Sequence, residues 1–277
     1  MAALVAELTA VKNCLQRALQ KGVRESVVLV FGNESCDLDS ACCSIVYALF
    51  AQQKRENKDE IVAPVLNLKR EQFLSRTEVL FWLDRVLLNN SGRSSSAVYD
   101  EACARLLDSL IFIDDIDFGQ IDTFRQLKVK MMDHNRLIDA QKFLEPYVDE
   151  IIDHHEVSGS AHPWSNAVRT EIVHPVGSCA SLITRRLRDE WPSMPSSVAL
   201  LLYGAIVLDT SALLNSNKTT DIDVSAVEYL ESKYSGVEGW PGRSYTDAML
   251  IEAKMDVSRM SAFDIFGKDF KSVPGSQ

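Results

Sequence analysis

The chain has 277 residues, of which 46% are hydrophobic, so it can build a sizeable core and wholesale disorder is excluded. Its formal net charge of -10 argues against nucleic acid as a partner, because that function needs a basic surface. The six cysteines form no CxxC pair and no secreted-scaffold spacing, which indicates reduced thiols in a cytoplasmic protein. No apolar run reaches the roughly 18 residues of a membrane span, so we expect no membrane association.

The first part of the chain alternates between helical and strand patterns. Apolar residues at helical spacing precede Gly22, which ends a first helix. The β-branched run at 26–31 predicts a strand buried on both faces, and a helix capped by Asp39 or Ser40 follows it. A second strand is expected at 60–68. After it we expect a helix and a surface loop, at 77–88 and 89–97.

The alternation continues through short apolar runs and two strong helices. The runs cover residues 110–114, 127–133, 148–153 and 170–175, and the helices cover 178–191 and 196–210. Strands that alternate with helices predict an α/β fold with a mainly parallel sheet flanked by helices. The pattern changes after residue 215. We therefore expect one α/β domain at 1–215, and a linker helix with the incomplete start of a second domain at 216–277.

Side chains that can bind metal stand where the predicted strands, and one apolar helix, end. They are Asn33, Asp37 and Asp39, then Asp133 and His134, then Asp153, His154 and His155, and finally Asp209. Carboxyl ends of parallel strands share one sheet edge, so these groups converge if the strand order permits. Clustered carboxylates would raise one another's pKa and take up protons unless a cation separates them. Carboxylate with imidazole suits Mn²⁺, Mg²⁺, Fe²⁺ or Co²⁺, and a pair of such ions can activate water against phosphorus.

Each of these motifs also has a purely structural interpretation. Asp37, Asp39 and Ser40 can cap a helix and complement its dipole. The DHN stretch at 133–135 can be an ordinary loop, and Asp209 can be a lone polar group at a helix end. Their joint occurrence, in this order and at strand-to-loop transitions, favours the metal site.

Seven stretches also resemble a known family. In chain order they are GNESCDLDS, PVLNLKR, MMDHN, IIDHHE, VGSCASLITRRL, GAIVLDTS and FGKDFK, and they span about residues 26 to 271. Together they resemble the DHH phosphoesterase superfamily. Within it, the chain is similar to the branch of the prune proteins and yeast-type exopolyphosphatases, relatives of the manganese-dependent family II inorganic pyrophosphatases.

The resemblance implies a role for each matching position. One divalent ion, Mn²⁺ or alternatively Mg²⁺ or Co²⁺, is expected on Asn33, Asp37 and Asp133. A second ion is expected on Asp39, Asp133, His154 and Asp209. Asp133 would bridge the two ions and, with His155, would be catalytic. Substrate phosphates are expected on His155, Arg70, Gly177 and Ser178.

Two departures from the family pattern shape the expected function. Asn33 stands where pyrophosphatases have a metal-binding His. This difference favours short-chain polyphosphate, or a nucleotide phosphodiester, as the substrate over pyrophosphate alone. The family's second domain, DHHA2, closes over the metals, but here the matching tail offers few basic residues, among them Lys254, Lys268 and Lys271. The resemblance therefore implies a metal-dependent phosphohydrolase that cleaves phosphoanhydride bonds, with reduced turnover. The alternative is a truncated regulatory protein that keeps the metal site and binds protein partners. For the enzyme, Asp39→Ala or Asp209→Ala is expected to abolish hydrolysis and leave the fold intact.

Overall fold

The computed structural model describes residues 2–21, 25–88, 104–157, 167, 169–234, 242–258 and 260. Its helices are α1 (Ala2–Lys21), α2 (Leu38–Lys54), α3 (Thr77–Leu87), α5 (Cys179–Glu190), α6 (Ser196–Asp209), α7 (Asp221–Tyr234) and α8 (Arg243–Met255). Its strands are β1 (Ser26–Phe31), β2 (Ile61–Val65), β3 (Gln126–Met132), β4 (Val148–Asp153) and β5 (Arg169–Ile172). The predicted loop at 89–97 and the FGKDFK stretch lie outside the described residues.

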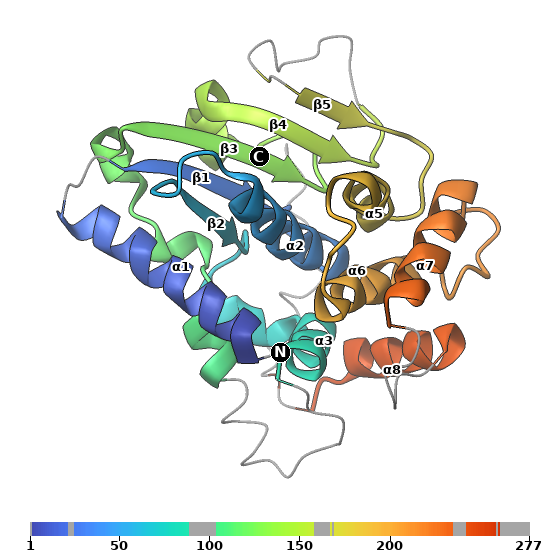
Figure 1. The fold of residues 1–277 in the computed structure, drawn as a ribbon. Helices are drawn as coiled ribbons and strands as arrows, with labels where there is room; N and C mark the ends of the chain where they lie inside the picture. The colour runs from blue at the N-terminus through green and yellow to red at the C-terminus, as the bar shows by residue number, and fades with distance from the viewer. Residues whose placement is uncertain are drawn as a thin grey trace, which may run out of the picture.

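The strands form one parallel sheet in the order β2-β1-β3-β4-β5 (Figure 1). β1 pairs with both β2 and β3, so Val28 lies between Val62 and Lys128. From β1 the chain moves to β2 on one side and later to β3 on the other, which creates a switch point between β1 and β3. Loops diverge at such a point and leave room for a ligand at the carboxyl ends of the strands. The predicted α/β fold with a mainly parallel sheet is confirmed.

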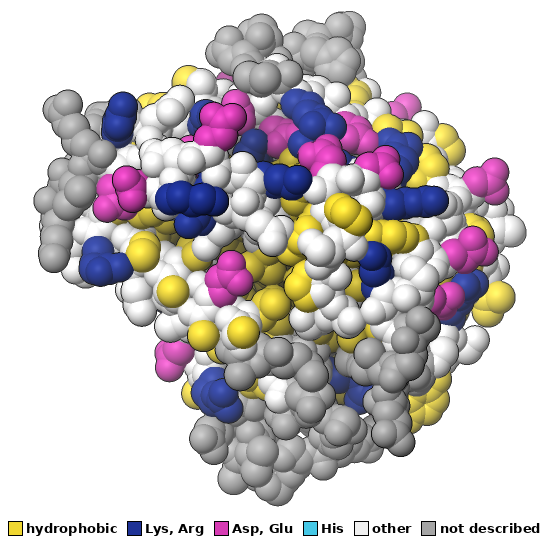
Figure 2. All heavy atoms as spheres, viewed as in Figure 1, with side chains coloured by type: hydrophobic (Ala, Val, Ile, Leu, Met, Phe, Trp, Pro, Cys, Tyr) yellow, Lys and Arg dark blue, Asp and Glu magenta, His cyan; other side chains and the backbone are white. Residues whose placement is uncertain are grey.

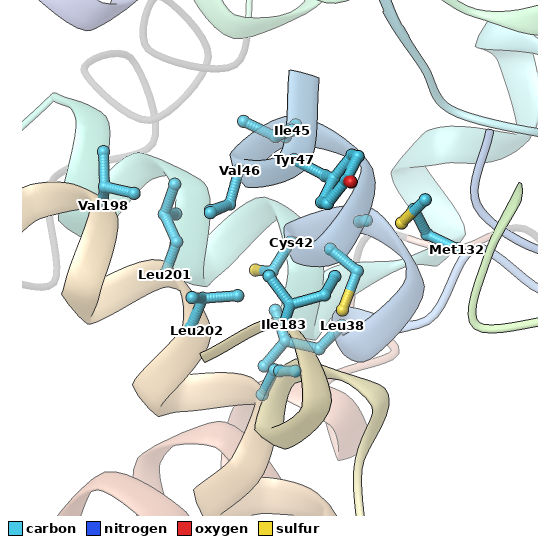
Figure 3. Packing of buried hydrophobic residues seen from close by; sticks show 14 of the residues in the cluster. Leu38, Cys42, Ile45, Val46, Tyr47, Met132, Ile183, Val198, Leu201 and Leu202 are labelled. Atoms are coloured by element: carbon cyan, nitrogen blue, oxygen red, sulfur yellow. The ribbon is translucent and has the colours of Figure 1, made fainter. Parts of the chain in front are cut away.

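Helices cover both faces of the sheet, as the β-branched strands predicted. α1 packs against one face, where Val11 and Leu15 join a buried cluster with Leu29 of β1. α2, α5 and α6 cover the other face, and α7 and α8 pack outside them (Figure 1). Figure 3 shows the centre of this second layer, where α2, α5 and α6 contribute the labelled residues Cys42, Ile45, Val46, Ile183, Leu201 and Leu202. This packing fixes the N-termini of α2 and α5 next to the sheet edge.

Two local predictions were wrong. The apolar run at 110–114 joins no strand: it makes a single parallel bridge, from Phe112 to Leu66, and then enters a 3-10 helix (Ile113–Asp115). The N-cap of α2 is Asp37, whose carboxylate accepts a hydrogen bond from the Ser40 N–H, and not Asp39 or Ser40. Asp39 is therefore inside the first turn of α2, where its side chain is free to reach another element.

The surface mixes both signs of charge. Arg185 pairs with Glu171 at 2.6 Å, and Arg169 lies 3.8 Å from Glu190. Figure 2 shows Lys and Arg side chains interspersed with Asp and Glu on the face that it draws. No helix in the described part of the chain is long and apolar enough to cross a membrane. The five cysteines in that part are free thiols.

Candidate metal centre

The predicted site residues of neighbouring strands meet at the switch point. Asn33 follows β1 and Asp133 follows β3, and the parallel register of these strands brings the two side chains together. The Asn33 amide nitrogen donates to Asp133 Oδ2 at 2.9 Å and to the Asp133 carbonyl at 3.2 Å. Asp133 adopts φ 65°, a left-handed conformation that costs energy for a non-glycine residue. The backbone is thus strained where it turns this carboxylate into the site.

Three side chains from different elements converge beside this turn. His154, at the end of β4, places Nε2 3.2 Å from Asp133 Oδ1 and 3.8 Å from Asp39 Oδ2. All three residues are at least nine-tenths buried. The ligand-type atoms of Asp133, His154 and His155 lie within 4.8 Å of one another. Asp39, Asp133, His154 and His155, four of the side chains expected at one sheet edge, therefore lie together in the structure.

The tautomer of His154 is set by a backbone carbonyl. Its Nδ1 lies 2.9 Å from the Val176 carbonyl oxygen, which can only accept a hydrogen bond. In the neutral ring, Nδ1 thus carries the proton and Nε2 presents its lone pair to Asp133 Oδ1. Two acceptor atoms at 3.2 Å repel each other unless a proton or a cation lies between them. This is the arrangement of an imidazole prepared to ligate a metal.

Asp39 is held by the N-terminus of α5. Its two carboxylate oxygens accept hydrogen bonds from the backbone N–H groups of Cys179, at 2.7 Å, and Ala180, at 2.9 Å. The Cys43 thiol donates to it at 3.2 Å. These backbone and thiol partners have no signature in the sequence. They fix the direction of Asp39 and place it in the positive end of the helix dipole.

A glycine allows α2 to start so close to the sheet. A Cβ on Gly32 would lie 2.5 Å from Ser40 Oγ and 2.8 Å from the Ser40 carbonyl oxygen. Any side chain at this position would push the first turn of α2 away from β1. Gly32 therefore keeps Asp37 and Asp39 at the edge where Asp133 emerges.

Asp209 enters the site from the end of α6. Its side chain is 27% exposed and lies 3.6 Å from the Lys218 ammonium group. The turn that follows is left-handed at Ser211, Ala212 and Leu213, with φ between 51° and 66°. Consecutive left-handed residues with side chains are costly, and such strain is concentrated at functional sites.

The carboxylates repel one another. Burial and the nearby Asp39 charge raise the pKa values of Asp133 and Asp209 well above the usual range, and they raise the pKa of Asp37 as well. Asp133 Oδ1 is buried and has no hydrogen-bond partner among the described residues. An unpaired buried carboxylate oxygen among other acids is expensive, and a cation removes the cost. This donor set of carboxylates and one imidazole fits a divalent cation.

Asp153 accepts hydrogen bonds that orient the two histidines that follow it. Its Oδ1 accepts hydrogen bonds from the His154 N–H at 2.8 Å and from His155 Nδ1 at 2.8 Å, while Asn135 donates to Oδ2 at 2.6 Å. Burial raises the pKa of Asp153, but the bonds from His155 outweigh it and hold the pKa below the usual value. His155 remains 55% exposed. The sequence placed Asp153 among the possible metal-binding side chains but assigned it no role. It gave no indication that Asn135 would bind Asp153.

His134 is not turned to the carboxylates as His154 is. It is buried, its Nδ1 contacts the Met132 carbonyl at 3.0 Å, and burial lowers the pKa of the imidazole. Its Nε2 is buried without a partner among the described residues. The structure thus gives His134 a local backbone contact, and its metal role stays a prediction.

Several predicted ligands already have protein partners. The Asn33 side-chain oxygen accepts from the N–H groups of Ser35 and Cys36, which leaves the amide nitrogen facing Asp133. The Gly177 N–H donates to Asp223 at 2.9 Å, and the Ser178 hydroxyl caps α5 by accepting from Ala180. The N–H groups at the start of α5 thus face carboxylates of the chain itself. The metal role of Asn33 and the phosphate roles of Gly177 and Ser178 stay predictions.

Arg70 is bound away from the carboxylates. Its guanidinium makes two hydrogen bonds to Asp115, at 2.6 and 2.8 Å, and lies 4.6 Å from the centre of the Phe112 ring. Although burial raises the pKa of Asp115, these bonds and the Lys12 charge hold it below the usual value. The geometry thus favours a structural role for Arg70 over the phosphate role, which nothing in the structure tests.

We expect Arg70→Lys to lower stability and leave substrate binding unchanged. Lysine cannot make the paired guanidinium–carboxylate contact, so the variant loses about 1 kcal/mol of unfolding free energy, a modest value because Arg70 is partly exposed. Urea unfolding and the KM for tripolyphosphate check this. A raised KM with unaltered stability would instead show that Arg70 contacts the substrate phosphates.

Comparisons with known proteins agree with this geometry. The chain matches the model of the DHH family, N-terminal domain, over residues 27–206. It is 32% identical over 247 residues to the human protein named "Exopolyphosphatase PRUNE1", covering 88% of this chain and 49% of that protein. It is also 32% identical over 276 residues to the Schizosaccharomyces pombe protein named "Putative exopolyphosphatase", covering 94% and 64%. The chain thus spans about half the length of the human relative.

A solved structure supports the fold. The crystal structure titled "Methanococcus jannaschii putative family II inorganic pyrophosphatase" superposes with a TM-score of 0.57 at 21% identity, covering 88% of this chain and 66% of that one. The family model reaches from β1 to α6 and includes every residue that converges at the switch point except Asp209. By sequence and by fold, the chain belongs to the DHH family.

Proposed function

We propose that the chain is a metal-dependent phosphohydrolase of the exopolyphosphatase type, which cleaves phosphoanhydride bonds of short-chain polyphosphate. One observation carries the proposal. The lone pair of His154 Nε2 faces the unpartnered Asp133 Oδ1 at 3.2 Å, inside a group of carboxylates whose pKa values are raised. At neutral pH such a cluster takes up protons or binds cations, and the imidazole lone pair among the carboxylates favours cations. The names of the matched relatives support the substrate class.

The residues that would hold the metal come from three strand ends and two helices. They are Asp37, Asp39, Asp133, His154 and Asp209, with Asn33 oriented by the turn at 33–36. The mixture of hard oxygen and imidazole donors suits Mn²⁺, with Mg²⁺ or Co²⁺ as substitutes, and the number of carboxylates suits two ions. When bound, such ions supply a deprotonated water at neutral pH and neutralise charge on phosphoryl oxygens.

Side chains around the cluster would bind the substrate. His155 is half exposed and its Nδ1 is committed to Asp153, which leaves Nε2 to contact a phosphate oxygen or move a proton. Lys218 lies beside Asp209, and the charge of Lys254 on α8 favours the ionised form of Asp37. These two cations come from segments that follow α6, and we propose that they meet the phosphates.

A phosphate-release panel tests the proposal. With Mn²⁺ we expect release from tripolyphosphate to exceed release from pyrophosphate, long polyphosphate and cyclic AMP, and EDTA to stop it. The Asp209→Ala variant serves as the inactive control. Release that persists with EDTA, or in this control, would refute the metal mechanism.

A second candidate is a regulatory protein that binds metal and protein partners without turnover. The observation that favours it is the occupation of Gly177, Cys179 and Ala180 N–H groups by protein carboxylates, which removes donors that a phosphate would need. For this candidate, calorimetry shows Mn²⁺ binding while no phosphate is released from any substrate of the panel.

A further inference from the structure

Asp223, in the first turn of α7, is a fully buried carboxylate outside the proposed metal ligands. Its side chain is 0% exposed. Oδ2 accepts from the Thr220 N–H at 2.8 Å and the Thr220 hydroxyl at 2.7 Å, and Oδ1 accepts from the Ser181 hydroxyl at 2.6 Å. These bonds join the start of α7 to α5. Closing the N-terminus of α7 and tying it to α5 explains these bonds fully.

One further bond leads from Asp223 to the metal centre. Oδ2 also accepts from the Gly177 N–H at 2.9 Å. The carbonyl of the same peptide unit belongs to Val176, and it accepts from His154 Nδ1 at 2.9 Å. Asp223 and His154 are therefore hydrogen-bonded to the N–H and the carbonyl, respectively, of a single planar peptide. The far nitrogen of His154 is the one that faces Asp133.

The packing at Gly177 shows how closely this peptide is held. A Cβ on Gly177 would lie 2.6 Å from Thr210 Cγ2 and 2.9 Å from Asp223 Oδ2. Glycine is thus required for the carboxylate to reach the N–H. Thr210 directly follows the proposed ligand Asp209, so the same contact places α7, the 176–177 peptide and the end of α6 against one another.

We propose that Asp223 is a positioning residue for metal binding, which acts on His154 through the Val176–Gly177 peptide. The inference rests on the proposed function, because it assigns His154 as a ligand. A carboxylate at the N–H polarises the peptide and makes its carbonyl a stronger acceptor. The stronger acceptor fixes the Nδ1–H tautomer, orients the ring and makes Nε2 a better donor to the metal.

The substitutions Asp223→Asn and Asp223→Ala separate charge from geometry. Asparagine can keep the oxygen for Gly177 and Thr220 and turn its NH₂ to Ser181, whose hydroxyl also accepts. It retains the bonds and removes the charge, whereas alanine removes both. Ser181→Ala is the matched control, because it deletes a different bond to Asp223 and leaves the path to His154 intact.

Calorimetric titration with Mn²⁺ gives the first readout. We expect the Kd to rise about 10-fold in Asp223→Asn and further in Asp223→Ala, within the range for lost outer partners of metal ligands. Ser181→Ala is expected to lower the melting temperature with a Kd within about twofold of wild type. Equal Kd values in wild type and Asp223→Asn would overturn the inference while leaving the proposed function standing.

The metal-free protein gives a second readout that needs neither turnover nor metal. Long-range ¹H–¹⁵N correlation at pH 8 should show the Nδ1–H tautomer of His154 in wild type and a tautomer mixture in Asp223→Asn. An Nε2–H tautomer in wild type would overturn the inference even if no variant folds. Absence of Mn²⁺ binding in wild type would instead refute the proposed function.

Discussion

Asp133→Asn is expected to abolish hydrolysis and, at the same time, to make the metal-free protein more stable. If Asp133 bridges the two ions as proposed, its loss removes several kcal/mol of transition-state stabilisation, which corresponds to about 10³-fold or more in rate. The stability gain, about 1–2 kcal/mol at pH 8, follows because the variant removes a buried carboxylate that its neighbours repel. Asparagine also tolerates the φ of 65° better than most residues. Urea unfolding with EDTA and phosphate release with Mn²⁺ measure the two effects.

The pH dependence has a definite sign. A carboxyl whose pKa is raised by folding stabilises the fold at pH values below its unfolded pKa, about 3.9 for Asp. That contribution is lost as the pH rises through the raised folded value. Metal-free wild type should therefore lose stability as the pH rises above about 4, and Asp133→Asn should lose less. A variant less stable than wild type at pH 8 would show that Asp133 is not under electrostatic strain.

Asp39→Ala and Asp209→Ala are expected to be equally inactive but to differ in stability. Alanine at 39 leaves the buried Cys179 N–H without an acceptor, while Ala180 keeps the Ser178 hydroxyl. An unpaired buried N–H costs about 1–3 kcal/mol, so the metal-free Asp39→Ala variant should unfold at lower urea concentration than wild type.

Asp209→Ala is the matched partner in that comparison. Asp209 is partly exposed and contacts Lys218, so its removal relieves repulsion and leaves α5 intact. We expect a urea midpoint at or above that of wild type. The sequence led us to expect an intact fold in both variants, and the hydrogen bonds of Asp39 add the expectation that Asp39→Ala is the less stable of the two. Equal midpoints for the two variants would contradict the capping role of Asp39.

The sequence predicted the fold well because its strands are unambiguous. The β-branched runs of β1 and β4 match their predicted positions, and alternation with helices made the sheet parallel. The run at 110–114 was misassigned because a short buried apolar segment has the same composition in a strand and in a loop. The sequence did not single out Asp37 as the N-cap, because Asp37, Asp39 and Ser40 are all good capping residues.

The sequence was enough to predict which side chains of the candidate site could bind metal. It was not enough to predict the groups that hydrogen-bond to these side chains and orient them. Asp, His and Asn at strand ends carry a local signal, and β1, β3 and β4 bring them together. The supports come from backbone groups with no sequence signature, such as the Val176 carbonyl that holds His154. Asp223 lies 46 positions from Gly177 in the chain, and only the packing of α7 on α5 joins them.

Anomalous X-ray scattering from crystals grown with Mn²⁺ tests the central claim most directly, namely that these side chains are gathered to hold divalent cations. We predict two peaks at the switch point, one in contact with Asp133 Oδ1, His154 Nε2 and Asp39, and both absent in Asp133→Asn crystals. The claim fails if crystals soaked at an Mn²⁺ concentration that saturates wild-type binding show no peak there, with Asp133 and His154 still in direct contact.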